Sequence, residues 1–201
     1  MGVVDATPFY SVGTIFKGNT LITDLSVLKM FTGVTSLERG AFNGCTHLNN
    51  IYLRNITNIN TYFSGTNTPF DNIGLQKIIL PSLRTSGDYC FRGTKNTTII
   101  DIGPNYTSLF SKMAGGVTAN TQTFVLRPDR VINVNPETYN FNPKRIYVPS
   151  NQLEAYRTDS NWSTYYANKL YAIGGTEWTT QFGSSDVYAD LTQQEYLDNY
   201  A

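Results

Sequence analysis

Pairs of apolar residues at positions i and i+2 recur along the chain. The clearest pair is Ile51 and Leu53, which has Asn50 before it and Tyr52 between its members. Alternation with a period of two is typical of a short strand that buries one face. The six pairs of this kind are Leu25/Val27, Ile51/Leu53, Ile78/Leu80, Ile100/Ile102, Phe124/Leu126 and Ile146/Val148. The pattern therefore predicts six short strands whose paired residues point into a shared core.

A Phe-x-Gly turn stands before several of these pairs at a constant distance. The copies that need no gap begin at Phe16, Phe42 and Phe91. A fourth copy, at Phe63, fits only if Asn67–Ile73 is an insertion that bulges from one turn. We expect each phenylalanine to fill the far side of its coil, and each glycine to allow a backbone turn at positive φ.

Six such units follow one another at roughly the 20–29-residue period of a leucine-rich repeat. One unit alone exposes both flanks of its strand and cannot bury its apolar side. Stacking solves this, because each strand pairs in parallel with neighbours about 4.8 Å away and the inward residues form a continuous ladder. The sequence therefore predicts a repeat solenoid with short parallel strands and irregular turns. The alternative is a β-sandwich with coincidental spacing, and the in-register Phe-x-Gly copies argue against it.

The segment 40–53, GAFNGCTHLNNIYL, resembles the BspA-type leucine-rich repeat, whose units typically read Ala-Phe-x-x-Cys-x-x-Leu-x-x-Ile-x-Leu-Pro. Leu80–Pro81 and Val148–Pro149 supply the strand-ending dipeptide of that pattern. Arg145–Ile173 looks like the closing unit common in the family, a last strand followed by a short helical cap. The resemblance covers about Phe16–Ile173. It implies a non-catalytic, extracellular binding or adhesion role, found also in proteins of phage particles, and no particular ligand.

The chain divides into four predicted parts: an N-terminal cap (1–15), the solenoid (16–150), a helical C-terminal cap (151–173) and a tail with a short terminal helix (174–201). In the helical cap, Asn151 with Glu154 forms a capping box that opens a helix over Gln152–Arg157. A second helical stretch is expected over Trp162–Leu170. The apolar residues expected to cover the final coil are Leu153, Tyr156, Trp162, Tyr165, Tyr166 and Leu170.

The tail begins after Gly174–Gly175, which break the chain. Its terminal helix is predicted over Gln193–Asn199, behind a capping box of Thr192 and Glu195. The tail could dock on the solenoid or on another subunit of an assembly. A glycine hinge followed by an amphipathic segment favours the second arrangement.

The surface chemistry argues against nucleic acid as a partner. The chain has 15 Lys and Arg, 15 Asp and Glu and no formal net charge, whereas DNA or RNA binding normally needs a basic patch. Abundant uncharged polar residues and 14 tyrosines instead suit adhesion to a protein or glycan surface. Tyrosine provides rigid, amphipathic contact area at such surfaces.

The amino terminus lacks the basic and apolar regions of a signal peptide. No stretch approaches the ~20 apolar residues needed to span a bilayer, so no membrane insertion is expected. Together with the resemblance, this predicts an extracellular location, on a cell surface or a virion. Either a leader has been removed, or the protein reaches the outside by cell lysis, as a virion protein does.

The sequence contains no motif for catalysis, cofactor binding or metal binding. Cys45 and His47 stand one residue apart, but the chain has a single histidine and the repeat family favours cysteine at the position of Cys45. Cys45 and Cys90 fall two coils apart, about 10 Å, which exceeds the ~7 Å Cα limit of a disulfide. We therefore expect two buried free thiols, no catalytic residue, no metal site and no cofactor. The carboxylates near the carboxy terminus lack the order of a calcium loop and are expected on a solvated helix face.

The residues that flank each inward pair point outward and form rows along the strand face. The predicted binding residues on this face are Tyr52, Ile79, Asp101, Val125 and Tyr147. Solenoids use such a face for recognition because its regular spacing gives an extended platform. The four apolar members are expected to contact a ligand, or else to be covered by the insertion, the tail or a neighbouring subunit.

These observations favour a non-enzymatic binding module that acts as an attachment or decoration protein on a phage virion or a cell surface. The alternatives are a purely structural spacer subunit of a larger extracellular or virion assembly, or a bacterial surface adhesin. A binder should carry clustered aromatic or apolar groups on its strand face, whereas a spacer should carry a polar, featureless one.

Overall fold

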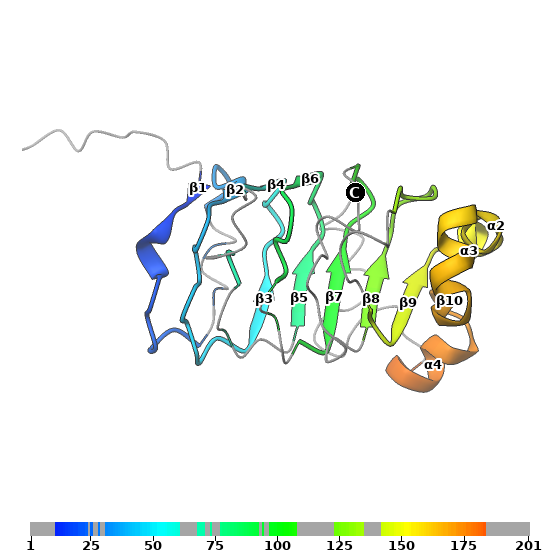
Figure 1. Ribbon diagram of the computed structural model, residues 1–201. Helices are drawn as coiled ribbons and strands as arrows, with labels where there is room; N and C mark the ends of the chain where they lie inside the picture. The colour runs from blue at the N-terminus through cyan, green and yellow to red at the C-terminus, as the bar shows by residue number, and fades with distance from the viewer. Residues whose placement is uncertain are drawn as a thin grey trace, which may run out of the picture.

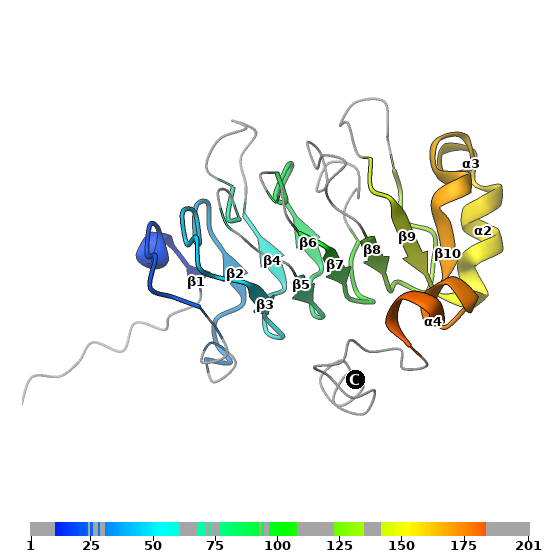
Figure 2. The ribbon, with the colours of Figure 1, turned by 90° about the horizontal axis from the view of Figure 1, so that it is seen from below.

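The computed structural model describes residues 11–23, 25, 28, 31–60, 68–70, 73, 77–92, 94, 97–107, 123–134 and 142–183. In this part the chain winds into a solenoid, with a six-stranded and a four-stranded sheet running along its axis (Figures 1 and 2). Three helices gather at the C-terminal end of the six-stranded sheet: α2 (Leu153–Thr158), α3 (Ser160–Tyr166) and α4 (Thr176–Phe182).

All neighbouring strands of the larger sheet are parallel, in the order β10-β9-β8-β7-β5-β3. In chain order these strands are β3 (Asn50–Tyr52), β5 (Lys77–Leu80), β7 (Ile99–Ile102), β8 (Thr123–Leu126), β9 (Arg145–Val148) and β10 (Leu170–Ala172). The residues that pair across the sheet are Ile51, Ile78, Ile100, Phe124, Ile146 and Leu170. Successive partners lie 22 to 27 residues apart, within the predicted repeat period.

The predicted inward ladder is confirmed from Ile51 to Val148. Both members of each of these five pairs belong to one buried core, as does Leu25 of the first pair. Its partner Val27 lies outside the described residues. This side-chain ladder gives each coil the apolar neighbours that a single repeat lacks.

The last strand, β10, was not predicted. The helical stretch expected over Trp162–Leu170 ends earlier, because α3 stops at Tyr166 and the 3-10 turn η5 (Ala167–Lys169) leads into the strand. Leu170 then pairs with Ile146 and is buried in the core. The sheet therefore continues one strand beyond the last sequence pair.

The smaller sheet was also missed by the sequence pattern. Its strands, in the order in which they pair, are β1 (Ser11–Val12), β2 (Ser36–Leu37), β4 (Asn58–Ile59) and β6 (Thr85–Ser86). Each has two residues, and all pairs are parallel. Strands this short show no alternation that a sequence pattern could reveal.

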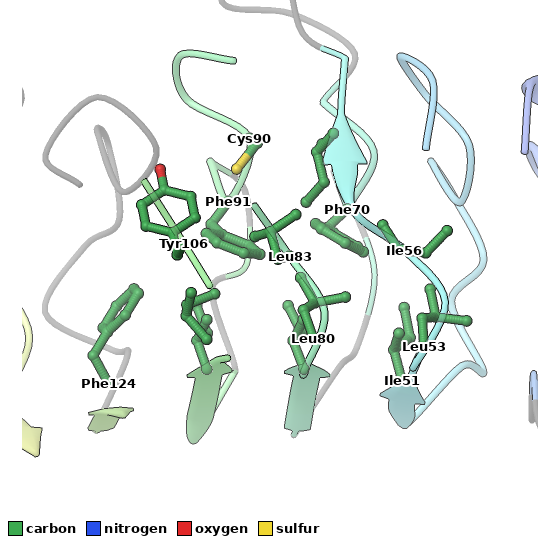
Figure 3. Packing of buried hydrophobic residues seen from close by; sticks show 14 of the residues in the cluster. Ile51, Leu53, Ile56, Phe70, Leu80, Leu83, Cys90, Phe91, Tyr106 and Phe124 are labelled. Atoms are coloured by element: carbon green, nitrogen blue, oxygen red, sulfur yellow. The ribbon is translucent and has the colours of Figure 1, made fainter. Parts of the chain in front are cut away.

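A column of stacked phenylalanine rings runs through the core. The ring centroids of Phe16, Phe42, Phe70 and Phe91 are separated in turn by 5.9, 6.2 and 5.5 Å, and neighbouring rings are within 20° of parallel. Phe124 closes the column edge-on, 6.5 Å from Phe91. Figure 3 shows Phe70, Phe91 and Phe124 between the strand row and the opposite wall. The predicted Phe-x-Gly phenylalanines Phe16, Phe42 and Phe91 therefore pack inside their coils, opposite the strand row, whereas Phe124 reaches the column from the strand β8.

The third member of this column is Phe70, so the alignment that began at Phe63 is wrong. The N–H of Phe42 donates to the carbonyl of Pro69 (2.9 Å), which fixes the register between these two coils. Phe70 and Ile73 are buried core residues within the segment expected to bulge as an insertion. Asn72 stands two residues after Phe70, where the other copies have glycine, and this substitution hid the copy. Phe63 itself lies outside the described residues.

Two kinds of position in the coils require glycine. Gly18 and Gly44 have φ of +72° and +77°, which confirms the predicted role of the Phe-x-Gly glycine at two copies. At Gly103, a Cβ atom would lie 1.6 Å from the carbonyl oxygen of Pro81 in the preceding coil. No side chain fits there without moving the backbone.

Helices α2 and α3 cover the last coil core. Tyr156, Trp162 and Tyr166 are buried, and the indole of Trp162 donates to the carbonyl of Ile132 (2.7 Å). Leu153 packs against this cluster as a partly buried residue. Tyr165 is an exception to the prediction, since 40% of it is exposed.

The predicted capping box does not form. The 3-10 turn η4 (Ser150–Gln152) precedes α2, whose N-cap Gln152 makes no side-chain capping bond. Asn151 instead donates to Asp129 Oδ1 (2.6 Å). The helix that is capped is α3, where Asp159 Oδ1 accepts from the N–H groups of Asn161 and Trp162 (3.0 and 3.1 Å).

Both cysteines are buried free thiols, as predicted. Cys45 Sγ lies 2.9 Å from the carbonyl oxygen of Phe16, at the start of the neighbouring coil, and accordingly donates to it. Burial raises the pKa of both thiols, so little thiolate forms at neutral pH.

We expect the native chain to react slowly with a thiol reagent at pH 8, because the thiols are both protonated and buried. After unfolding without reductant, two equivalents should react. The measurement is a colorimetric thiol titration before and after addition of guanidinium chloride. Fewer than two equivalents in the unfolded chain would contradict the assignment of free thiols.

Candidate binding face

The predicted binding residues form one row on the outer side of the larger sheet. The strand pairing aligns Tyr52, Ile79, Asp101, Val125 and Tyr147 across five consecutive coils. Each lies next to an inward core residue, so strand alternation turns its side chain to the outside. We call this side, with the parallel row of Lys77, Ile99, Thr123 and Arg145, the outer strand face. The predicted alignment of the row is therefore confirmed.

Helix α4 packs on the C-terminal half of this face. Gly174, with φ of +74°, turns the chain after β10 so that the helix returns toward the sheet (Figure 2). The tyrosine of β9, Tyr147, meets Trp178 and Phe182 edge-on, with ring centroids 5.0 and 5.7 Å apart. Trp178 and Tyr147 are both fully buried. Burying these aromatic rings is the main physical reason for the helix to stay on the sheet.

Polar contacts fix the orientation of α4 on the strands. The hydroxyl of Tyr147 donates to Gln181 Oε1 (2.9 Å), and Gln181 Nε2 donates to the hydroxyl of Thr123 in β8 (3.1 Å). Burial raises the pKa of Tyr147 to about 12, so the phenol remains a hydrogen-bond donor over the physiological range. Arg145 also pairs with Glu177 (2.9 Å), but both side chains are more than one third exposed and the pair adds little stability.

A buried ion pair lies in the middle of the outer strand face. Asp101 in β7 is only 1% exposed, and Arg127 follows β8 directly. Arg127 Nε lies 2.9 Å from Asp101 Oδ1 and Arg127 Nη2 lies 2.8 Å from Oδ2, so the guanidinium binds both carboxylate oxygens. Charges buried in a row of apolar side chains require such a bidentate partner.

Most side chains of the outer row are therefore buried, unlike those of an open strand face. Val125 and Tyr147 are fully buried, and Ile79 is 5% exposed. Of the three covers considered from the sequence, the tail supplies one: α4, Thr176–Phe182, docks on the sheet of its own chain. Tyr52 is half-buried at the N-terminal edge of the face and packs against the same cluster.

One missed signal could have revealed α4. Trp178 and Phe182 stand four residues apart after a Gly-Gly break, which is the spacing of one helix face. The hydroxyl network at Thr123 and Gln181 has no comparable sequence signal, since it depends on how the helix docks.

The described residues hold no group of three or more His, Cys, Asp or Glu side chains placed to bind a metal ion. Within the same part of the chain, no helix has the length and apolar character required to cross a bilayer. The site geometry is thus that of a surface built from strand rows, aromatic rings and two ion pairs, one buried and one partly exposed.

Comparison with known families agrees with this geometry. The family model described as BspA type leucine rich repeat region matches six copies in this chain, over residues 14–128 and 66–150. The chain belongs to the BspA-type leucine-rich repeat family. A search of curated proteins finds no match. Membership of this family indicates a protein-binding or surface-associated repeat module, of a kind that is generally non-enzymatic.

Proposed function

We propose that this BspA-type repeat chain is a non-enzymatic attachment or decoration protein, displayed on a phage virion or a cell surface, that binds a protein or glycan through its outer strand face. The observation that carries the proposal is the aligned outer row, in which aromatic and aliphatic side chains repeat at the strand spacing. Rows of this kind create a preorganised platform, and aromatic residues on such platforms tend to dominate binding energy.

Helix α4 supports the capacity of this face to hold another chain segment. Its docking uses a buried tryptophan, an edge-on tyrosine and side-chain hydrogen bonds across β8 and β9. These are the ingredients of a protein interface, with an aromatic centre and a polar rim. A partner would use the remaining N-terminal part of the face, around Tyr52.

Location is tested first. Peptides released by protease from intact cells, and purified phage particles from the same culture, are analysed by mass spectrometry. We expect peptides of this chain in one of these two fractions. Recovery only from the soluble contents of lysed, particle-free cells would contradict display on a surface.

Tyr52→Ala is expected to weaken attachment of the purified, labelled chain to those cells or particles by about fivefold or more, since a half-buried aromatic at a binding surface contributes over ~1 kcal/mol. The matched control is Tyr165→Ala, a partly exposed tyrosine on α3 at the far end. Thermal unfolding followed by circular dichroism checks that both variants fold. Equal attachment of the two folded variants would remove Tyr52 and the outer strand face from the proposed site.

The burial of four of the five predicted residues favours a second candidate, the structural spacer. A face already filled by the chain itself offers less apolar area to a partner. A spacer would be found in the same surface fraction, and the purified chain would bind neither cells nor particles.

A further inference from the structure

We propose that the outer side of the smaller sheet, together with Tyr89, is a second binding site and takes a neutral glycan that contains hexose units. This site goes beyond the proposed function, because it lies on a different sheet from the outer strand face. The strands of the smaller sheet run along the upper edge of the solenoid in Figure 1, and the larger sheet lies below them.

The backbone of Tyr89 has a conformation that an equivalent coil gives to glycine. The strand pairing aligns Leu37 of β2 with Ser86 of β6 through β4, and Gly40 and Tyr89 each follow three residues later. Gly40 has φ of +71° and Tyr89 has φ of +60°. The carbonyl of each accepts from the N–H three residues further on (3.1 and 2.9 Å). The two coils therefore make the same turn, and this turn favours glycine.

A tyrosine is an unexpected residue in such a turn. Among the residues that the structure describes, Tyr89 is the only non-glycine residue with positive φ. A bulky side chain in this conformation carries a steric cost, and strained residues of this kind cluster at functional sites. Tyr89 is also partly exposed, so a ligand can reach it.

The surface beside Tyr89 is polar. The pairing of β2, β4 and β6 aligns Ser36, Asn58 and Thr85, and the next outward residues of the first two coils are Glu38 and Asn60. Thr85 is exposed and the other four are partly exposed. Such a surface lacks the apolar centre of a protein interface. It suits a ligand whose own groups are mainly hydroxyls.

Hydrogen bonds hold these polar side chains in place across three coils. The hydroxyl of Thr85 donates to Asn58 Oδ1 (2.8 Å), and Asn58 Nδ2 donates to Asn60 Oδ1. Asn60 Nδ2 then donates to Glu38 Oε1 (2.8 Å). An amide has two N–H donors, and this chain of bonds uses one in each asparagine. Side chains that are already ordered lose little freedom when a ligand binds.

The aromatic residue and the polar network lie next to each other. The N–H of Gly87 donates to the carbonyl of Ile59 (2.9 Å), which continues the pairing of β6 beside Asn60, and Tyr89 follows two residues later. A hexose carries both matching chemistries, because its hydroxyls can pair with amides and carboxylates while its C–H face packs on an aromatic ring. From β2 to β6 there are two strand spacings, about 10 Å, which suits a short oligosaccharide.

The charges around the network favour a neutral ligand. Within three residues of β2, β4 and β6, the charged residues are Glu38, Arg39, Arg84 and Asp88, two acidic and two basic. The surface therefore carries no excess charge that would select an acidic glycan or a nucleic acid.

An array of defined oligosaccharides, neutral and sialylated, tests the ligand class with the full-length chain. We expect binding to one or more neutral oligosaccharides that contain hexoses. Binding to sialylated members alone, or to no member, would overturn the inference.

The variant Tyr89→Gly tests the role of the ring, because it restores the residue found at Gly40. Calorimetric titration with the bound neutral oligosaccharide should show affinity reduced by about fivefold or more. The substitution also relieves the left-handed strain, so the melting temperature should not fall by more than ~4 °C. A larger fall would show that the ring is kept to hold the turn, and would overturn the inference.

The variant Asn60→Ala tests the network independently of the turn. It removes the amide between Asn58 and Glu38, and we expect the same titration to show about tenfold weaker binding. Tyr165→Ala and Tyr52→Ala are the controls and should bind the oligosaccharide as the parent does. Unchanged binding by Tyr89→Gly or Asn60→Ala, or loss of binding by Tyr52→Ala, would overturn the inference. The attachment test of the outer strand face uses cells and particles, so either proposal can fail without the other.

Discussion

Replacing Ile51 with aspartate is expected to lower the free energy of unfolding by about 4 kcal/mol or more, enough to unfold a marginal repeat chain. Ile51 is 1% exposed and pairs with Ile78 in the inward ladder. A carboxylate there would lie in the apolar core, beside Ile78 of the next coil. Because coils are stabilised by their neighbours, the loss should spread beyond β3.

The measurement is urea unfolding followed by circular dichroism, with hydrogen exchange to show which coils open. The control is Leu21→Asp, the same kind of change at an apolar residue that is 87% exposed in the first coil. We expect the control to change the unfolding free energy by less than ~0.5 kcal/mol. An unchanged midpoint for Ile51→Asp would contradict the inward ladder.

The ladder was predictable because strand alternation and the repeat period constrain each other. Once Ile51 and Leu53 are assigned inward, the spacing assigns Ile100 and Ile146 as well, and the pairing follows. The error at Phe63 has the same source. The Phe-x-Gly pattern requires glycine two residues after phenylalanine, and the copy at Phe70 has Asn72 at that position. Asparagine is one of the residues that adopt turn conformations more readily than most.

The candidate site was predictable only as a row of positions. Alternation places Tyr147 outward, but no local sequence pattern predicts that α4, about 30 residues later, will bury it. Such a contact depends on the turn at Gly174 and on the fit of Trp178 against the sheet. For this reason Tyr147 is a poor residue for testing partner binding, since its loss would also release α4, whereas Tyr52 can be changed with less effect on the fold.

The ion pair on the outer strand face gives the second large effect. Arg127→Met is expected to cost about 3–5 kcal/mol, because it removes the group that binds both oxygens of the buried Asp101 carboxylate. The control is Arg145→Met, which breaks a pair that is more than one third exposed and should cost less than ~1 kcal/mol. Urea unfolding of the three chains measures the difference.

The double variant Asp101→Val/Arg127→Met separates the cost of a broken pair from the value of the pair itself. Asp101 stands between Ile79 and Val125 in the outer row, where valine suits the strand better than aspartate. Replacing a buried ion pair with apolar side chains is often neutral or stabilising, so most of the loss in Arg127→Met should be recovered. If the double variant is as unstable as the single one, the pair contributes net stability to the face. If Arg127→Met itself costs less than ~1 kcal/mol, then water reaches Asp101 and the middle of the outer strand face is open.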